Sequence, residues 1–359
     1  RQRQMCIRDS YKLMKTLIVG FGIAGLSLVH QLRRNNVSFH VIDSPKNSSS
    51  LVAGGVLNPT VLKRYNMSWK GKDFSDYALS FYQEISNFLN YDVYSEMAIN
   101  RIFPSPKEHN KWSEASDKHD LNYYLNKNLT LKTFDAINTP YGIGTLKNVG
   151  RLDFKEIILK YREAIKNDYK KEEFQYSKLK FNNGEVIYNN DSYDNIVFCE
   201  GYSMKNNPFF NYLPLTGSKG EMLIIRSSML SEKAIWKSKF FIVPLGQSLF
   251  WVGATFNDID KTTEKSLSAK NELLSELNQK LNIPFEVVGH EAQIRPTVSD
   301  RRPLLGSHYK LDNLYIFNGL GTRGSLMAPW LSEFMYNYIF SEKALPTSID
   351  IRRFTVEKN

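Results

Sequence analysis

Three glycines near the N-terminus have the spacing that most directly implies chemistry. Gly20, Gly22 and Gly25 form a G-x-G-x-x-G pattern, which follows a β-branched run over Lys15–Gly20 and opens an apolar helical pattern. In such a turn the first glycine permits a tight bend, the second lets the backbone approach a pyrophosphate, and the third lets helix and strand pack closely. Free N–H groups at the helix start face the phosphates. The pattern predicts a dinucleotide site.

An aspartate follows the second strand of this unit. Residues Val37–Ile42 are predicted to form that strand, and Asp43 comes directly after it. A carboxylate at this place is expected to accept hydrogen bonds from the adenosine ribose hydroxyls and disfavours a 2′-phosphate. The strand, helix and strand together predict one right-handed βαβ unit.

A second glycine-rich turn near the C-terminus distinguishes FAD from NAD. The turn contains Gly319, Gly321, Thr322 and Gly324 and lies between a predicted buried strand, residues 313–318, and a predicted helix over residues 325–340. A reduced flavin carries negative charge at N1 and the C2 carbonyl, which a helix N-terminus stabilises. NAD has less need of a second such site, so we expect FAD.

Composition excludes several classes of protein. The chain has 359 residues, of which 42% are hydrophobic and 23% charged, so it is not disordered as a whole. No apolar run approaches the roughly 18 residues that cross a bilayer. The net charge of +10 permits a polyanionic partner, although scattered lysines indicate solvated surface. Two cysteines and six histidines show no disulfide framework or metal spacing, so we expect no metal and a cytoplasmic location.

The remaining patterns predict an α/β fold with a second, more antiparallel part. Apolar residues recur at helical spacing over 73–89 and 153–165, each beginning with an aspartate suited to an N-cap. Strands are expected over 221–226, 240–243 and 250–254, close enough in sequence to be antiparallel neighbours. Asn182-Asn183-Gly184 indicates a hairpin turn. Residues 1–13 are polar and aperiodic and are interpreted as a disordered tail, with Met14 as a plausible start.

Five motifs, in order, resemble those of the D-amino-acid oxidase and glycine oxidase group of FAD-dependent oxidoreductases, and the resemblance extends from Lys15 to about Phe340. The motifs are the N-terminal LIVGFGIAGLS, the flavin loop Ala53-Gly54-Gly55, the strand end before Gly201, the run from Val243-Pro244 through Gly253-Ala254-Thr255 to Arg295-Pro296-Thr297, and the C-terminal GLGTRGSLMAP. The resemblance implies a Rossmann-like FAD-binding domain and a mainly antiparallel α+β substrate domain. It also implies flavin contacts at Gly54, Gly55 and Gly201.

Within this group the match is uneven. Leu320 stands where simple oxidases usually have a histidine, and Phe241 where they usually have a substrate-facing tyrosine. The C-terminal motif is more similar to the FAD-dependent half of the bifunctional enzymes that make 5-methylaminomethyl-2-thiouridine in tRNA. No counterpart of their methyltransferase half precedes Met14, so the flavin half is expected to stand alone.

The resemblance also implies roles for two arginines. Arg295 is expected to bind a substrate carboxylate, because a planar guanidinium grips a carboxylate through two parallel hydrogen bonds. Arg323 is expected to touch the flavin or an anionic substrate. His290 is interpreted as a structural residue, since a lone histidine on a strand is more often a satisfied core group.

The expected organisation is a discontinuous FAD-binding domain of residues 14–75, 146–210 and 295–345, with a substrate domain of residues 76–145 and 211–294. The expected reaction removes a hydride from the carbon next to an amine, and water then hydrolyses the imine. An N-substituted glycine is the favoured substrate. A tRNA-borne carboxymethylaminomethyl group is an alternative, as is a flavoprotein without turnover. The patterns do not indicate an oligomeric state.

Overall fold

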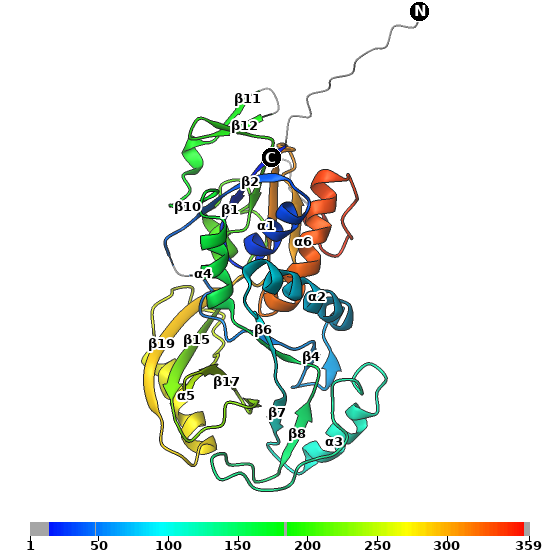
Figure 1. Ribbon diagram of the computed structural model, residues 1–359, viewed down its shortest axis with the longest axis vertical. Helices are drawn as coiled ribbons and strands as arrows, with labels where there is room; N and C mark the ends of the chain where they lie inside the picture. The colour runs from blue at the N-terminus through cyan, green and yellow to red at the C-terminus, as the bar shows by residue number, and fades with distance from the viewer. Residues whose placement is uncertain (1–13, 47, 183–184, 355–359) are drawn as a thin grey trace, which may run out of the picture.

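The protein is built around two large sheets, one above the other in Figure 1. The computed structural model describes residues 14–46, 48–182 and 185–354. In the six-stranded sheet the order is β10-β2-β1-β14-β21-β20, and all neighbours are parallel except β20 and β21. Its strands are β1 (Lys15–Val19), β2 (Ser38–Asp43), β10 (Tyr169–Lys171), β14 (Asn195–Phe198), β20 (Leu304–Ser307) and β21 (Leu314–Asn318).

The predicted βαβ unit is confirmed. Helix α1 (Ile23–Arg34) connects β1 to β2, which pair in parallel from Lys15↔Ser38 to Val19↔Ile42. Strands β1 and β14 are buried almost throughout, as a parallel sheet covered on both faces requires.

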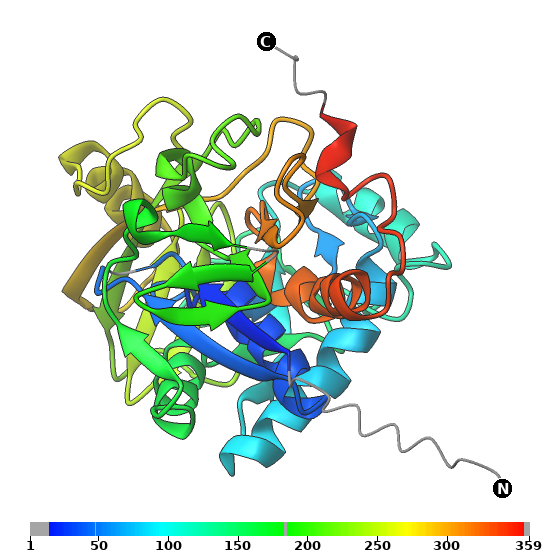
Figure 2. The same ribbon diagram turned by 90° about the horizontal axis from the view of Figure 1, so that it is seen from above.

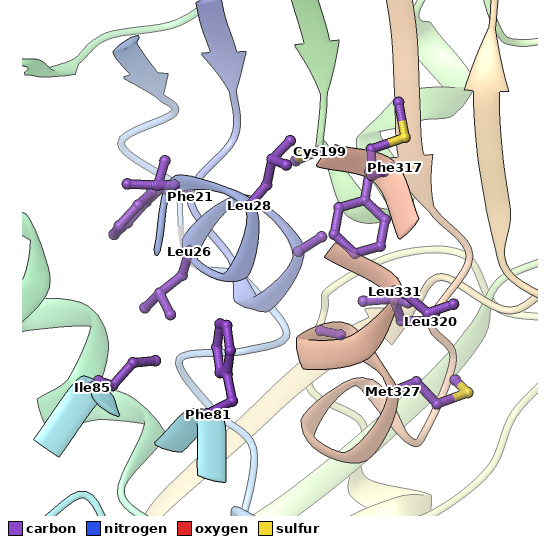
Figure 3. Packing of buried hydrophobic residues seen from close by; sticks show 14 of the residues in the cluster. Phe21, Leu26, Leu28, Phe81, Ile85, Cys199, Phe317, Leu320, Met327 and Leu331 are labelled. Atoms are coloured by element: carbon purple, nitrogen blue, oxygen red, sulfur yellow. The ribbon is translucent and has the colours of Figure 1, made fainter. Parts of the chain in front are cut away.

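Helices α1 and α6 (Gly324–Phe340) pack on the six-stranded sheet, and α2 (Gly71–Leu89) packs against α6. All three helices contribute to the same core. Figure 3 shows Leu26 of α1 on the side of Phe81 of α2, and Leu331 of α6 beside Leu320; all four are buried. Helix α2 therefore belongs to the core of this sheet, and the expected domain boundary after residue 75 falls inside it.

The seven-stranded sheet has the order β19-β15-β18-β17-β16-β7-β8 and is antiparallel except between β7 and β16. Helix α5 (Leu267–Lys280) packs on one face through Leu273 and Leu277. The opposite face points toward the six-stranded sheet. The strands are β7 (Ile99–Ile102), β8 (Ile143–Leu146), β15 (Ser218–Arg226), β16 (Ile235–Lys237), β17 (Phe241–Gly246), β18 (Leu249–Gly253) and β19 (Glu286–Arg295).

Smaller elements connect and flank the sheets; β11 and β12 lie beside the six-stranded sheet in Figures 1 and 2. The smaller strands are β3 (Val56–Leu57), β4 (Thr60–Val61), β5 (Asn66–Met67), β6 (Tyr94–Glu96), β9 (Gly150–Leu152), β11 (Lys180–Asn182), β12 (Glu185–Tyr188) and β13 (Asp191–Tyr193). The remaining helices are α3 (Lys107–Ser116), α4 (Phe154–Ala164), η1 (Tyr176–Lys178), η2 (Gly201–Asn206) and η3 (Ile351–Arg353).

The predicted helix ends are partly right. Asp153 caps α4, because its side chain accepts a hydrogen bond from the Glu156 N–H. The cap predicted at Asp73 is wrong: α2 begins two residues earlier, and Asp73 lies in its first turn, where a negative charge still suits the helix dipole. Strands β11 and β12 are antiparallel as expected, while Asn183 and Gly184 of the predicted turn, like residues 1–13, lie outside the described residues. None of the described helices is long and apolar enough to cross a membrane.

Candidate active site

A cavity of about 780 Å³ lies between the β1–α1 turn and the inner face of the seven-stranded sheet. This volume is within the range of cofactor and ligand sites. Most of the residues predicted from the sequence line it, although they come from six separate stretches of chain. The predicted residues in the lining are Gly20, Gly22, Asp43, Gly54, Gly55, Gly201, Arg295, Gly321, Thr322 and Gly324, whereas Gly25, Gly319 and Arg323 lie outside it.

The β1–α1 turn has the geometry that a pyrophosphate needs. Gly20 adopts a left-handed φ of +96°, and its N–H donates to the Ile42 carbonyl at 2.8 Å. A Cβ on Gly25 would lie 2.0 Å from the Gly20 carbonyl oxygen, so only glycine permits this contact between helix and turn. Gly22 is the N-cap of α1, and the first turn holds no acidic residue. The open helix N-terminus therefore suits a phosphate.

Asp43 is already bonded to the protein. Its Oδ1 accepts a hydrogen bond from the Phe21 N–H at 2.9 Å. Its Oδ2 accepts from Arg162 at 2.5 Å and from the Tyr169 hydroxyl at 2.9 Å. Asp43 lines the cavity and at the same time fixes the β1–α1 turn, so only part of its accepting capacity is left for a ribose.

The flavin loop is held by a tryptophan from the other sheet. The Trp251 indole on β18 donates its Nε1–H to the Val52 carbonyl at 2.8 Å. A Cβ on Gly54 would lie 2.8 Å from the Trp251 ring, so the glycine lets the ring lie against the loop backbone. Trp251 therefore joins the seven-stranded sheet to the loop over residues 53–55, which lines the cavity.

The C-terminal turn opens α6 toward the cavity, but Arg323 points elsewhere. Gly319 and Gly321 adopt left-handed φ values of +74° and +55°. The guanidinium of Arg323 donates to the backbone carbonyls of Asn58 at 2.9 Å and Thr60 at 3.1 Å. These hydrogen bonds direct the Arg323 side chain toward the backbone, and so they do not favour the expected contact with flavin or substrate. They tie the α6 N-terminus to the segment after the flavin loop.

Arg295 projects into the cavity from the end of β19. Its Nη2 donates to the Thr255 carbonyl at 3.1 Å, its Nη1 donates to the Lys219 carbonyl at 3.4 Å, and the Phe256 ring lies 4.3 Å from its Cζ. Burial lowers the pKa of this guanidinium to about 10, which still leaves it charged at neutral pH. Within the described part of the chain it forms no ion pair, so its charge is available to a ligand.

The absence of a side chain at Gly220 makes room for this arginine. A Cβ on Gly220 would lie 2.1 Å from Arg295 Nη2 and 2.4 Å from its Cζ. Gly220 is on β15, next to β19, two residues after Ser218, which faces Arg295 in the register, so Gly220 and Arg295 are on the same face of the sheet. The guanidinium therefore lies flat across the glycine.

Apolar side chains form part of the cavity wall near Arg295. Leu320 and Phe241 both line the cavity, in the places where the sequence suggested a histidine and a tyrosine. Met222 contributes to the same wall. His290, interpreted as structural, bonds through Nε2 to Glu221 at 2.9 Å and is not in the lining. Leu320, Phe241 and Met222 offer no hydrogen bond, whereas Tyr202, Glu291 and Gln293 add polar groups to the lining.

A carboxyl group lies at the cofactor end of the cavity. Glu200 follows β14, and its oxygens accept hydrogen bonds from the Tyr176 hydroxyl at 2.5 Å and the Asn207 amide at 2.7 Å. Burial raises its pKa to about 7, against the effect of these two hydrogen bonds. Elsewhere among the residues described, no group of three His, Cys, Asp or Glu side chains could hold a metal ion.

Comparison with known proteins accounts for this architecture. A family described as FAD dependent oxidoreductase (DAO) matches residues 15–337. The chain belongs to this family of FAD-dependent oxidoreductases. The glycine turn, the open start of α1 and the large cavity fit FAD on their own geometry.

One relative by sequence and two solved structures illustrate what the chain is similar to. The bifunctional protein MnmC of Idiomarina loihiensis, named for tRNA 5-methylaminomethyl-2-thiouridine biosynthesis, is 27% identical over 41% of this chain, a match that spans 25% of the relative. Glycine oxidase from Bacillus cereus superposes with a TM-score of 0.75 at 18% identity, covering 92% of this chain and 96% of the other. Iminodiacetate oxidase from Chelativorans sp. has the same TM-score and identity, covering 93% and 99%. The structural matches show a shared fold.

Several residues of the site have no signal in the sequence. Trp251, Phe256 and Gly220 line the cavity without having been singled out in the sequence, and Glu200 lies in the motif that ends at Gly201 but was given no role. Their neighbours in the site come from strands and loops far away in the chain. The pairing of β15 with β19 and β18 brings Gly220 and Trp251 close to Arg295.

Proposed function

We propose that this DAO-family protein oxidises the C–N bond of an N-substituted glycine. One observation carries the proposal: the charged guanidinium of Arg295 lines the cavity and forms no ion pair within the described residues. A charge in such a place is costly unless a ligand pairs with it. A carboxylate fits the planar group through two hydrogen bonds.

The apolar part of the wall favours a secondary amine over a primary one. Leu320 and Phe241 offer no hydrogen bond, and a secondary amine has one N–H fewer to satisfy. The glycine part binds through its carboxylate at Arg295, while the nitrogen substituent lies along the wall formed by Phe241 and Met222. The names of the glycine oxidase and iminodiacetate oxidase that share the fold are consistent with such a substrate.

The chain contributes binding, orientation and electrostatics to the reaction. FAD, when bound, would serve as the oxidant that accepts a hydride from the carbon next to the nitrogen. Arg295 fixes that carbon by holding its carboxylate, and water later hydrolyses the imine that leaves the site. The α6 N-terminus, opened by Gly321, directs N–H groups toward negative charge that develops in the cavity.

Replacement of Arg295 tests this proposal. In Arg295→Ala we expect the substrate concentration for half-maximal flavin reduction to rise by about thirtyfold or more, since loss of a buried charged partner costs about 2 to 5 kcal/mol. The flavin spectrum of the variant should stay nearly unchanged. Arg295→Lys keeps the charge without the planar guanidinium, so its half-maximal substrate concentration should lie between those of the wild type and Arg295→Ala. Unaltered concentration dependence in Arg295→Ala would refute the assignment.

A tRNA-borne substrate is a second candidate, favoured by the name of the MnmC relative and the net charge of +10. A carboxymethylaminomethyl group is itself an N-substituted glycine and presents the same carboxylate. Flavin reduction by modified tRNA, and its sensitivity to salt, separates this candidate from a small-molecule oxidase. A flavoprotein without turnover would show no reduction with either.

A further inference from the structure

Two cations stand on the wall of the seven-stranded sheet that faces the cavity, beyond the residues already described. Arg101 on β7 and Lys237 on β16 are direct partners in the register. Lys237 in turn faces Phe241 on β17, and Phe241 faces Gly253 on β18. Opposite residues of paired strands point to the same face. Both cations therefore share the face on which Phe241 and Gly253 line the cavity.

These cations lie next to the cavity lining without belonging to it, and no carboxylate of the described residues forms an ion pair with them. The Lys237 ammonium lies 4.7 Å from the centre of the Phe241 ring. Lys237 donates to the Lys239 carbonyl at 2.6 Å, and Arg101 donates to the Ser238 carbonyl at 2.6 Å. Across the described residues neither side chain forms an ion pair. The Nε of Arg101 is buried and has no hydrogen-bond partner.

The nearest acids compensate the pair only in part: the positive charge of Arg101 helps to lower the pKa of Glu108, but this carboxylate has other partners. Glu108 is bonded to the Tyr65 hydroxyl at 2.5 Å and to Lys111 at 3.1 Å. Burial and the positive charge of Arg101 lower the pKa of Lys237 to about 7, and Glu276 opposes this only weakly. Two half-buried like charges beside each other are unfavourable, and an anion between them removes the cost.

We propose that Arg101 and Lys237 form a second anion site, which binds an oxyanion on the nitrogen substituent of the substrate. This inference rests on the proposed function, in which Arg295 holds the glycine carboxylate. Arg295 on β19 and Lys237 on β16 are four strand spacings apart, roughly 19 Å between backbones. A free amino acid cannot reach both sites. The structure thus assigns the protein a substrate with a long nitrogen substituent that ends in a carboxylate or a phosphate.

A series of substrates of increasing length can act as a ruler for this site. The holoenzyme is reduced anaerobically with N-(carboxyalkyl)glycines and with N-alkylglycines of the same length that lack the second acid. We expect the ratio of kcat/KM, acid over alkyl, to be near one for short chains. It should rise about tenfold to a hundredfold at the length that reaches Lys237, as for hydrogen bonds to charged groups. A parallel series ending in a phosphonate shows which oxyanion binds better.

The matched variants are Lys237→Met and Lys239→Met. Lys239 is exposed and pairs with Glu272 at 2.8 Å, so its loss should leave the wild-type ratio intact. In Lys237→Met the ratio should fall to about one at every length. A ratio that never rises in the wild type, or one that rises equally in Lys237→Met, overturns the proposal.

A second readout does not depend on turnover. Lysines of the FAD-loaded protein are methylated with ¹³C, and the Lys237 signal, assigned by its loss in Lys237→Met, is titrated with and without inorganic phosphate. Phosphate should raise the pKa of Lys237 and leave the pKa of Lys239 unchanged. No change, or an equal change at both lysines, contradicts the anion site. If no N-substituted glycine reduces the flavin, the proposed function fails, and this titration still decides the anion site.

Discussion

Replacing Gly220 by alanine should separate substrate binding from folding. The new Cβ would lie 2.1 Å from Nη2 and 2.6 Å from Nη1 of Arg295. Ordinary van der Waals contact needs about 3.5 Å, so the guanidinium must retreat by more than about 1 Å. Because the colliding atoms are the flexible end of a long side chain, the strand itself can remain in place.

The expected loss follows from this displacement. A shift of about 1 Å in a positioning group can reduce the rate about a hundredfold, which corresponds to about 2.7 kcal/mol. We therefore expect kcat/KM for N-methylglycine to fall about a hundredfold in Gly220→Ala, with normal FAD content. The assay is anaerobic rapid mixing, followed through the absorbance of oxidised flavin.

A glycine on the neighbouring strand provides the control. A Cβ on Gly289 of β19 would meet only Ile224, at 3.3 Å, away from the cavity lining. Gly289→Ala should keep nearly wild-type kinetics and stability. Equal kinetics in Gly220→Ala and the wild type would refute the placement of Arg295 across Gly220. A Gly220→Ala protein that lost FAD or failed to fold would refute the claim that the arginine yields first.

Three further predictions concern the cofactor part of the cavity. Gly22→Trp should purify without FAD, because the side chain would occupy the place of the pyrophosphate; an absorption spectrum of the purified protein checks this. Trp251→Phe removes one hydrogen bond to the Val52 carbonyl, which is worth about 0.5 to 1.5 kcal/mol. A fluorescence titration should therefore show FAD binding weakened by up to about tenfold. An unchanged Kd would show that this bond does not hold the loop. Burial raises the pKa of Glu200 to about 7, so the folded protein keeps a proton that the unfolded chain releases near pH 4.5. The free energy of unfolding of the apo-protein should therefore fall by up to about 3 kcal/mol as the pH rises from about 4.5 to about 7. Urea unfolding at several pH values should show that Glu200→Gln lacks this loss.

The parts of the fold that depend on local sequence were predictable. The β1–α1–β2 unit follows from consecutive residues, because the glycine spacing fixes the turn and the apolar period fixes the helix. The cap at Asp153 is equally local. Strand ends moved by a few residues, for example β15, which begins at Ser218 where the pattern indicated Glu221. Pairing with β19 extends it through residues whose own pattern is not strand-like.

The site could be predicted only where a motif carried it. Arg295 came from a resemblance, whereas its position across Gly220 depends on the register of β15 with β19. Arg323 shows the limit of such reasoning, since its motif position suggested a ligand and the backbone carbonyls of Asn58 and Thr60 occupy it. Lys237 could not be predicted as a site residue either, because its neighbour Arg101 is 136 residues away in the sequence. The two residues meet only through the parallel pairing of β16 with β7.

The central claim is that the protein oxidises an N-substituted glycine held by Arg295. Anaerobic mixing of the FAD-loaded protein with N-methylglycine, longer N-alkylglycines and D-alanine tests it most directly. The account predicts that the N-alkylglycines bleach the flavin rapidly while D-alanine does so slowly or not at all. Rapid bleaching by D-alanine, with none by the N-alkylglycines or by carboxymethylaminomethyl-modified tRNA, would contradict it.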